Sequence, residues 1–466
     1  MGNPQARAGL ADLMPAKEYP TMRSEALHSS DSSRPGLPAM WVMGILVLAA
    51  IYFLYRGPWR ASSGMGDYME IYSAARAWGQ GADPYDLPAV QRVWMASGVP
   101  ADYTPGMVDL PSLYPPSALV LFSPFSLPSW PAAQWLWLGV NLLAMGAILF
   151  CATAISGLRR GSTGQLLLTA GLLAFSPFHT AITMGQPGII VVALVMAGLL
   201  LAWRERDVAA GLLLGLAMAT KPQLAGLFVA YYLMRGRWRL AGVAAGLSMV
   251  LFIIGIWPLM ISHIPWWSHW QSALHGLQRG GFADFTEHGD APYKMVNLHY
   301  AAYQLLHHRT ATMVLCTLLS AALFALGVWR SWGVRSGDVR ERLALALMAA
   351  VSLIAVYHLF YDAALLAVVI AVMAGMVRGE GVSGLSGRAA VASRRWTAAV
   401  WLVMVPFLIP GAVALAVMQQ AGRLPQWLTG GAMWRTVILP HQCWALLLLA
   451  LLLSWRLMRR GERVTR

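Results

Sequence analysis

The chain has 466 residues, of which 58% are hydrophobic and 12% are charged, and its formal net charge is +14. A soluble globular domain carries about twice that charged fraction, so the composition argues against a soluble fold and indicates an all-α polytopic membrane protein. The basic residues fall mainly in short loops between apolar runs, as the positive-inside rule expects. Membrane lipids are therefore expected partners, and nucleic acid is not.

The N-terminal part of the sequence predicts a tail, a first span and an external loop. Residues 1–37 are polar and lack the pattern of a cleaved signal peptide, so we expect a flexible cytoplasmic tail. An uncleaved signal-anchor helix is predicted near 38–56. The next segment, 57–114, carries six acidic residues against three basic ones, which indicates an external location.

The external loop begins with the stretch "GMGDYMEIYSAARAWGQGADPYDL". Tyr68, Ile71, Tyr72 and Ala75 recur at helical spacing, which predicts an amphipathic helix lying along the membrane surface. Asp67 stands where such a helix begins. The residue type suits a helix N-cap, and a catalytic carboxylate is the alternative interpretation.

The apolar runs after this loop predict a total of about 12 transmembrane helices. Residues 115–128 contain Pro124 and Pro128 and are expected to be re-entrant or interfacial, so that the second span is 131–155. A core module of about seven spans would cover 38–261, and a second external loop would cover 262–309. The C-terminal spans would lie within 310–460, with 461–466 as a cytoplasmic tail. The other predicted spans are near 164–181, 187–203, 207–220, 222–235, 239–261, 311–331, 341–357, 362–378, 396–417 and 437–457.

Lys221 lies between two of the shorter predicted helices, where Pro222 opens the backbone. Ionisable residues within a membrane are costly, so this lysine is a functional candidate that is suited to bind a phosphate as a point charge. The alternative is a lysine that reaches the interface or pairs with a buried acid.

The sequence gives no sign of a metal or a cofactor. Cys151, Cys316 and Cys443 lie within apolar runs and are expected to be small buried hydrophobes. Scattered histidines such as His179 and His299 do not have zinc-ligand spacing. A nucleotide-binding motif is also absent, which disfavours a nucleotide-sugar donor.

Several stretches together resemble glycosyltransferase family 87, the polyprenyl-phosphate-mannose-dependent mannosyltransferase-like group of the GT-C superfamily. They are the first loop motif, "YPPSALVLFSPFSLP", "GQPGIIVVALVMAGLLLAWRERDVAAGLLLGLAMATKPQ", "LMRGRWRLAG" and "HLFYDAALL". The resemblance covers roughly residues 38–380. It implies a GT-C fold with amphipathic surface helices in the first external loop and a polyprenyl-phosphate-linked sugar as donor.

The resemblance also assigns roles to particular residues. Asp67 takes the position of the acidic residue that the family has in this loop. Its carboxylate would then be the general base of an inverting transfer to a lipid or glycan hydroxyl on the external face. Lys221, His358 and Lys294 are then candidates to bind the donor phosphate. Mannose is the expected sugar, with arabinose or another pentose as alternatives, and the expected location is a bacterial inner membrane. The candidates for the sugar and acceptor pocket are Tyr72, Tyr85, Tyr114, Gln186, Gln223 and Asp362.

The principal rival is a polytopic transporter or flippase for a lipid-linked or polar glycan. Many spans and buried polar groups would serve such a protein equally well, but transporters usually have internal repeats, and none is visible here. A membrane-bound acyltransferase is disfavoured because no histidine-centred catalytic motif is present. An uptake assay set against a lipid-linked sugar turnover assay separates transport from transfer.

Overall fold

The computed structural model of the chain describes residues 39–382 and 388–459. Helices form nearly all the regular structure of these ranges, with one isolated β-bridge between Met295 and Leu359. The tails predicted at 1–37 and 461–466 lie outside the described residues, as does part of the loop between the helices α16 and α17.

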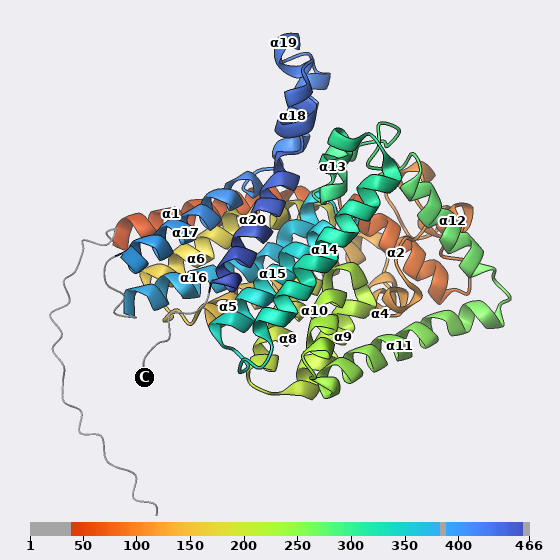
Figure 1. The fold of residues 1–466 in the computed structure, drawn as a ribbon. Helices are drawn as coiled ribbons and strands as arrows, with labels where there is room; N and C mark the ends of the chain where they lie inside the picture. The colour runs from red at the N-terminus through yellow and green to blue at the C-terminus, as the bar shows by residue number, and fades with distance from the viewer. Residues whose placement is uncertain (1–38, 383–387, 460–466) are drawn as a thin grey trace, which may run out of the picture. The chain divides into compact units, whose positions relative to one another are not determined.

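The N-terminal half of the described chain contains eleven α-helices (Figure 1). A π-helical turn, Tyr55–Trp59, follows the first of them, and a 3₁₀ turn, Pro105–Met107, follows the third. The α-helices are α1 Ala39–Leu54, α2 Gly66–Gly79, α3 Leu87–Met95, α4 Pro116–Ser126, α5 Trp130–Ser156, α6 Thr163–Ala174, α7 Ser176–Met184, α8 Gly188–Trp203, α9 Asp207–Thr220, α10 Pro222–Met234 and α11 Trp238–Ile261.

The C-terminal half adds nine α-helices in the described ranges. They are α12 Trp266–Gln278, α13 Leu298–Leu306, α14 Arg309–Ser331, α15 Val339–Ala355, α16 Ala367–Val382, α17 Arg388–Met404, α18 Gly411–Gln420, α19 Gln426–Thr429 and α20 His441–Met458. Four short turns lie between them: η3 Pro292–Lys294, η4 Phe360–Leu366, η5 Val405–Phe407 and η6 Trp434–Ile438.

Six helices of the described chain are long and apolar enough to cross a bilayer, and two bent helix pairs raise the number to as many as eight. The protein is therefore an integral membrane protein. The bent pairs are Thr163–Ala174 with Ser176–Met184 and Ser393–Phe407 with Gly411–Gln420. Helices α8, α9 and α10 have only 16, 14 and 13 residues. At about 1.5 Å per residue they are shorter than about 30 Å of hydrocarbon, so the total of about 12 spans stays a prediction.

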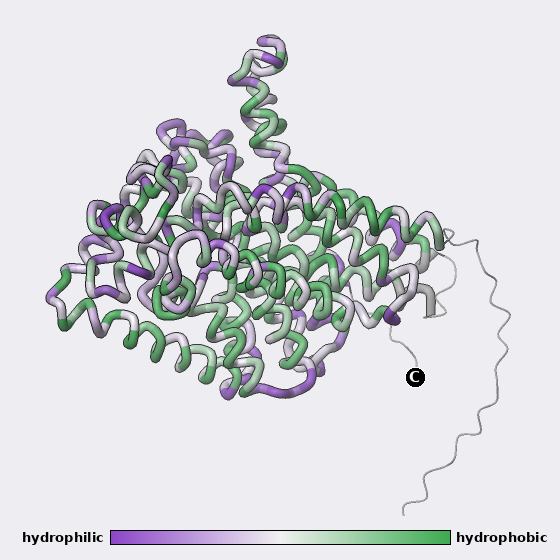
Figure 2. The backbone as a smooth tube through the Cα atoms, turned by 180° about the vertical axis from the view of Figure 1, so that it is seen from behind, coloured by the Kyte–Doolittle hydropathy of each residue, from purple (hydrophilic) through white to green (hydrophobic). Residues whose placement is uncertain are grey.

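Helix α15 forms the centre of the C-terminal half. It packs against α14, α16 and α20, and almost every residue from Leu343 to Ile354 is buried (Figure 1). Hydrophobic residues run through the long helices, while hydrophilic residues gather in the segments that connect them (Figure 2). This distribution is what a helical protein requires when lipid rather than water covers its sides.

The external loop contains the predicted helix, but its aromatic face does not rest on lipid. Tyr68, Ile71, Tyr72 and Ala75 are all buried within the protein. Tyr68 stacks on Trp137 of α5, with ring centroids 4.6 Å apart, and its hydroxyl donates to the Phe125 carbonyl oxygen of α4. The apolar stripe predicted to face lipid thus packs against other helices of the same chain, because α4 and α5 fold back over α2.

Candidate functional site

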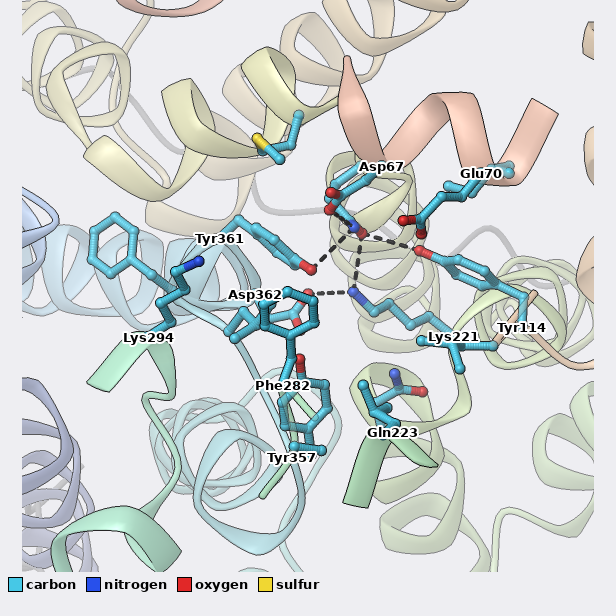
Figure 3. A pocket seen from close by; sticks show the side chains of 18 of the residues that line it. Asp67, Glu70, Tyr114, Lys221, Gln223, Phe282, Lys294, Tyr357, Tyr361 and Asp362 are labelled. Atoms are coloured by element: carbon cyan, nitrogen blue, oxygen red, sulfur yellow. Dashed lines mark hydrogen bonds and ion pairs between the residues drawn. The ribbon is translucent and has the colours of Figure 1, made fainter. Parts of the chain in front are cut away.

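A cavity of about 770 Å³ opens among the loop 57–114, α7, the α9–α10 junction and the segment from Val356 to Asp362. This volume is typical of a small-molecule site. Asp67 and Glu70 reach it from one helix, α2, and meet Lys221, Tyr361 and Asp362 from distant parts of the chain (Figure 3).

A strained helix start places Asp67 at the cavity wall. Met65 is the N-cap of α2, with a φ of 71°, and its N–H donates to the Thr183 carbonyl oxygen at 3.1 Å. Gly185 then ends α7 at a φ of 70°, and a Cβ there would lie 2.6 Å from the Cβ of Tyr68. Only glycine suits both this conformation and this close approach. Asp67 lies in the first turn of α2 rather than at the cap.

Gln186 connects the catalytic candidate to the rest of the cavity. Its side-chain Nε2 donates to an Asp67 carboxylate oxygen and to the Tyr361 hydroxyl, the latter at 3.1 Å. Its Oε1 accepts from the Tyr114 hydroxyl at 3.1 Å and from Lys221 Nζ at 3.3 Å. Both ends of the amide are therefore fixed, and the amide in turn orients the Asp67 carboxylate.

Lys221 pairs with Asp362 in the same network. Its Nζ lies 2.5 Å from Asp362 Oδ1, and it also lies 5.2 Å from the centre of the Tyr361 ring. The other carboxylate oxygen of Asp362, Oδ2, contacts His358 Nδ1 at 3.0 Å. Pro222 begins α10 directly after Lys221, so the helix break leaves this lysine at the junction with its side chain turned inward.

The second external loop is joined to this network through its backbone. The Val296 N–H donates to the His358 carbonyl oxygen at 3.0 Å, and Met295 forms the β-bridge to Leu359. Lys294 consequently lines the cavity, with its Nζ 5.2 Å from the centre of the Phe282 ring. Among the described residues it has no carboxylate partner.

Most of the residues predicted for the site line the cavity, and three lie behind its wall. The Tyr72 hydroxyl donates to the Pro128 carbonyl oxygen at 2.7 Å, and the Tyr85 hydroxyl donates to the Tyr114 carbonyl oxygen at 3.1 Å. His358 is fully buried behind Asp362. These three side chains do not line the cavity and lie against its wall, so their predicted contacts to a ligand stay predictions. The predicted residues that line the cavity are Asp67, Tyr114, Gln186, Lys221, Gln223, Lys294 and Asp362.

Several residues that line the cavity are not among the residues predicted for the site. Glu70 lies three residues after Asp67, and on a helix this spacing puts both carboxyls on one face. That signal is present in the sequence. Tyr361 precedes Asp362 directly, whereas Arg56 and Trp270 come from segments that no local pattern connects to the site.

The two carboxyls of α2 have shifted pKa values. Burial raises the pKa of Asp67, while hydrogen bonds from Gln186 and Tyr361 and the positive charge of Lys221 oppose the rise. Burial raises the pKa of Glu70 well above its usual range, and the nearby Asp67 and Asp109 carboxyls raise it further. Asp67 is the better candidate for a proton acceptor, because Gln186, Tyr361 and Lys221 oppose the rise of its pKa and no group of the described residues opposes that of Glu70.

Residues 113–359 match the family model of glycosyltransferase family 87, and this range is just over half of the chain. The chain belongs to glycosyltransferase family 87. The matched range is shorter than the 38–380 of the predicted resemblance. It includes Gln186, Lys221 and Lys294 but neither Asp67 nor Asp362, so the case for Asp67 as the reactive carboxylate depends on geometry.

Curated relatives of this family 87 member include two enzymes named polyprenol-phosphate-mannose-dependent alpha-(1-2)-phosphatidylinositol mannoside mannosyltransferase. One is from Mycobacterium tuberculosis, 28% identical over 54% of this chain and 58% of the relative. The other is from Mycolicibacterium smegmatis, 24% identical over 55% of this chain and 58% of the relative. A corresponding phosphatidylinositol pentamannoside enzyme of the latter organism is 30% identical over 38% of this chain and 40% of the relative. The matches thus span less than two thirds of these relatives, and no solved structure matches the chain significantly.

Proposed function

We propose that the protein transfers a sugar, with mannose the expected one, from a polyprenyl-phosphate donor to a hydroxyl of a lipid or glycan acceptor. The observation that carries the proposal is the state of Asp67 in the cavity. Its carboxylate is held by the neutral amide of Gln186 and forms no ion pair with another described residue, because Lys221 pairs with Asp362 instead. A carboxylate oriented without being neutralised is suited to accept a proton.

In the proposed reaction the acceptor oxygen attacks the anomeric carbon of the donor sugar. Asp67 takes the proton of the acceptor hydroxyl as the new C–O bond forms. The bond between the anomeric carbon and the phosphate oxygen breaks, and its electron pair leaves with the polyprenyl phosphate. A phosphate leaves without protonation, so a second carboxylic acid is not required as a proton donor.

This single displacement inverts the anomeric centre. A retaining route would need a carboxylate nucleophile that first forms a glycosyl–enzyme bond. Glu70 is the other cavity carboxyl on α2, but its raised pKa favours the protonated form, which is a poor nucleophile. Nuclear magnetic resonance of the product anomeric proton, compared with that of the donor, tests the inversion.

One proposed contact to the donor phosphate comes from the second large loop. Lys294 lines the cavity without a carboxylate partner among the described residues, so it is the first candidate to bind the phosphate and stabilise its developing charge. Lys221 acts with Asp362 and Gln186 to position Asp67, and His358 holds Asp362 from behind. The predicted role of Lys221 at the phosphate thus becomes mainly one of positioning.

We place the cavity and both large loops on the external face of a bacterial inner membrane, which the GT-C-type core spans. The charge bias of the loops supports this orientation. A lipid-linked donor would then reach the cavity from the side of the bilayer, and a polar acceptor group would reach it from the aqueous side.

Reconstituted protein tests the proposal against the transporter alternative. Labelled polyprenyl-phosphate-mannose is supplied with a lipid extract as acceptor, and labelled product is followed by chromatography. Movement of the intact donor between leaflets is followed in parallel with sealed vesicles. New glycosylated product supports transfer. Translocation of intact donor without any product would contradict it.

A further inference from the structure

One lobe of the cavity carries positive charge that the transfer reaction has not used. It lies between the π-helical turn after α1 and the helix α7, and it is lined by Arg56, Arg60, His179 and Thr183. We call these four residues the arginine lobe. Lys294 reaches the cavity from a different segment, the turn η3 of the second external loop.

The arginine lobe is built into the fold. The Thr183 hydroxyl donates to the Arg56 carbonyl oxygen at 2.8 Å, and the turn packs on α7 where Gly57 faces Ile182. The Met65 N–H donates to the carbonyl oxygen of the same Thr183 at 3.1 Å, two residues before Asp67. The lobe and the catalytic candidate are therefore fixed to the same end of α7.

The cations of the lobe lack anionic partners among the described residues. Neither Arg56 nor Arg60 forms an ion pair, and the Arg56 Nε atom is buried without a hydrogen-bond acceptor. Arg60 has only the Tyr55 ring, with its guanidinium carbon 5.7 Å from the ring centre. The Nε2 atom of His179 donates to the Leu173 carbonyl oxygen at 2.5 Å, so the two arginines and not this histidine supply the positive charge of the lobe. Buried polar groups usually have partners, so the Arg56 Nε atom is suited to donate to a ligand that accepts hydrogen bonds.

The surroundings indicate where that ligand comes from. Tyr55 and Trp59 of the same turn are 56% and 73% exposed at the end of a candidate span. Exposed tyrosine and tryptophan at a span end are typical of the headgroup level of a bilayer. Two guanidinium groups at that level match the geometry and charge of a phosphate.

We propose that the arginine lobe is an anion subsite that binds the phosphate of a lipid substrate, either together with Lys294 on the donor phosphate or on a second phosphate-bearing lipid. The inference rests on the proposed function, because it assigns a phosphate-bearing lipid to the same cavity. The ligand is either the polyprenyl monophosphate of the donor or the phosphodiester headgroup of an acceptor lipid. An arginine pair that only meets bulk headgroups is the simpler interpretation, but it would not place Arg56 in the cavity wall with Nε buried.

Binding measurements without turnover test the lobe. The wild type, an Arg56→Gln/Arg60→Gln double variant and an Arg92→Gln control are placed in phosphatidylcholine nanodiscs. Arg92 is a matched control because it is exposed on α3 and does not line the cavity. Polyprenyl monophosphate, phosphatidylinositol and uncharged polyprenol are titrated, and native mass spectrometry gives the affinities. Arg60→Gln alone, at an exposed position, is the second variant if the double variant does not fold.

The double variant should lose about tenfold or more in affinity per guanidinium for a phosphate lipid. Polyprenol binding and the control should be unchanged. A loss confined to polyprenyl monophosphate assigns the lobe to the donor, and a loss confined to phosphatidylinositol assigns it to the acceptor. Wild-type affinity of the double variant for both phosphate lipids would overturn the proposal. Because binding is measured without catalysis, the binding result does not depend on the outcome of the transfer assay. A failure of the proposed function can therefore be distinguished from a failure of the proposed subsite.

Discussion

Lys221 and Asp362 form an ion pair at 2.5 Å between Nζ and Oδ1, and these residues are 5% and 3% exposed. The pair joins the break between α9 and α10 to the turn η4. Because Lys221 is paired with Asp362, the Asp67 carboxylate accepts a hydrogen bond from the Gln186 amide and has no cation of the described chain bound to it. The ion pair is therefore a condition for the proposed base, because a lysine placed directly on Asp67 would hold its pKa down and weaken it as a proton acceptor.

We predict that Lys221→Ala lowers both stability and activity. Removing one partner leaves the buried Asp362 carboxylate uncompensated, which should cost about 3–5 kcal/mol of unfolding free energy. Thermal unfolding in detergent measures the loss. A Lys221→Met/Asp362→Leu double variant should regain most of the stability, because it removes both charges and keeps an apolar volume.

Activity of that double variant separates positioning from folding. Without Lys221, Gln186 loses one of the two donors to its Oε1, so the Asp67 carboxylate is held less firmly. We expect turnover to stay at least about tenfold low even when stability is restored. A double variant that is stable and as fast as the wild type would show that the pair is structural alone.

Asp67→Asn should fold normally and lose roughly 10²–10⁴-fold in turnover, because the amide accepts hydrogen bonds but cannot take a proton. The side chain does not cap α2, so loss of a cap does not confound the result. Asp102→Asn is the matched control, since Asp102 is exposed on the same external segment and does not line the cavity. Near wild-type transfer by folded Asp67→Asn would end the assignment of the base.

The pH profile reports the protonation of Asp67. A general base must be ionised, so the rate should fall as pH drops through its pKa, and burial places that fall at higher pH than for an exposed aspartate. Gln186→Ala removes a hydrogen bond that lowers this pKa, so it should move the acid limb to still higher pH. Glu70→Gln should leave the limb in place, because burial raises the pKa of Glu70 and favours its neutral form, which glutamine imitates. The dependence of kcat on pH measures all three.

The sequence predicts the helices well because apolar runs and their breaks are local signals. Lys221 with Pro222 indicates a helix break, and the observed α9 and α10 meet there. The alternative interpretation of Lys221, a pair with a buried acid, is the observed one. Its partner Asp362 lies 141 residues away, and no local pattern identifies such a contact.

The aromatic helix shows where local patterns are insufficient. Tyr68 and Tyr72 have the spacing of a helix face, and that spacing is the same whether lipid or protein covers it. The helices that cover this face, α4 and α5, come from a segment beyond the loop. Their packing over α2 is a long-range tertiary contact that a local pattern does not predict. For this reason the sequence does not reveal that the Tyr72 hydroxyl contacts the Pro128 carbonyl oxygen instead of lining the cavity.

Gly185→Ala should displace the catalytic network. The residue has a φ of 70°, and an added Cβ would meet the Cβ of Tyr68 at 2.6 Å. Both the conformation and the contact oppose a side chain, so unfolding stability and turnover should fall together, with a stability loss of about 1–3 kcal/mol or more. Gly171→Ala in α6 is the control, because a Cβ added there would meet nothing within 4 Å and alanine favours the helix. Equal behaviour of the two variants in thermal unfolding and transfer assays would contradict this account.

The proposed external cavity requires that both large loops share one side of the membrane. The cavity draws Asp67 from the first loop and Lys294 from the second, so one orientation must expose both.

The chain's own cysteines, Cys151, Cys316 and Cys443, are buried, which suits labelling through introduced thiols. In intact cells, an impermeant maleimide should label Asp102→Cys and His288→Cys but not Arg335→Cys, which lies in a basic loop predicted to be inside. All three should label after permeabilisation, since each position is exposed. Labelling of Arg335→Cys from outside would contradict the proposed orientation. Labelling of only one loop variant would put the two loops on opposite sides, and either result would rule out the proposed external site.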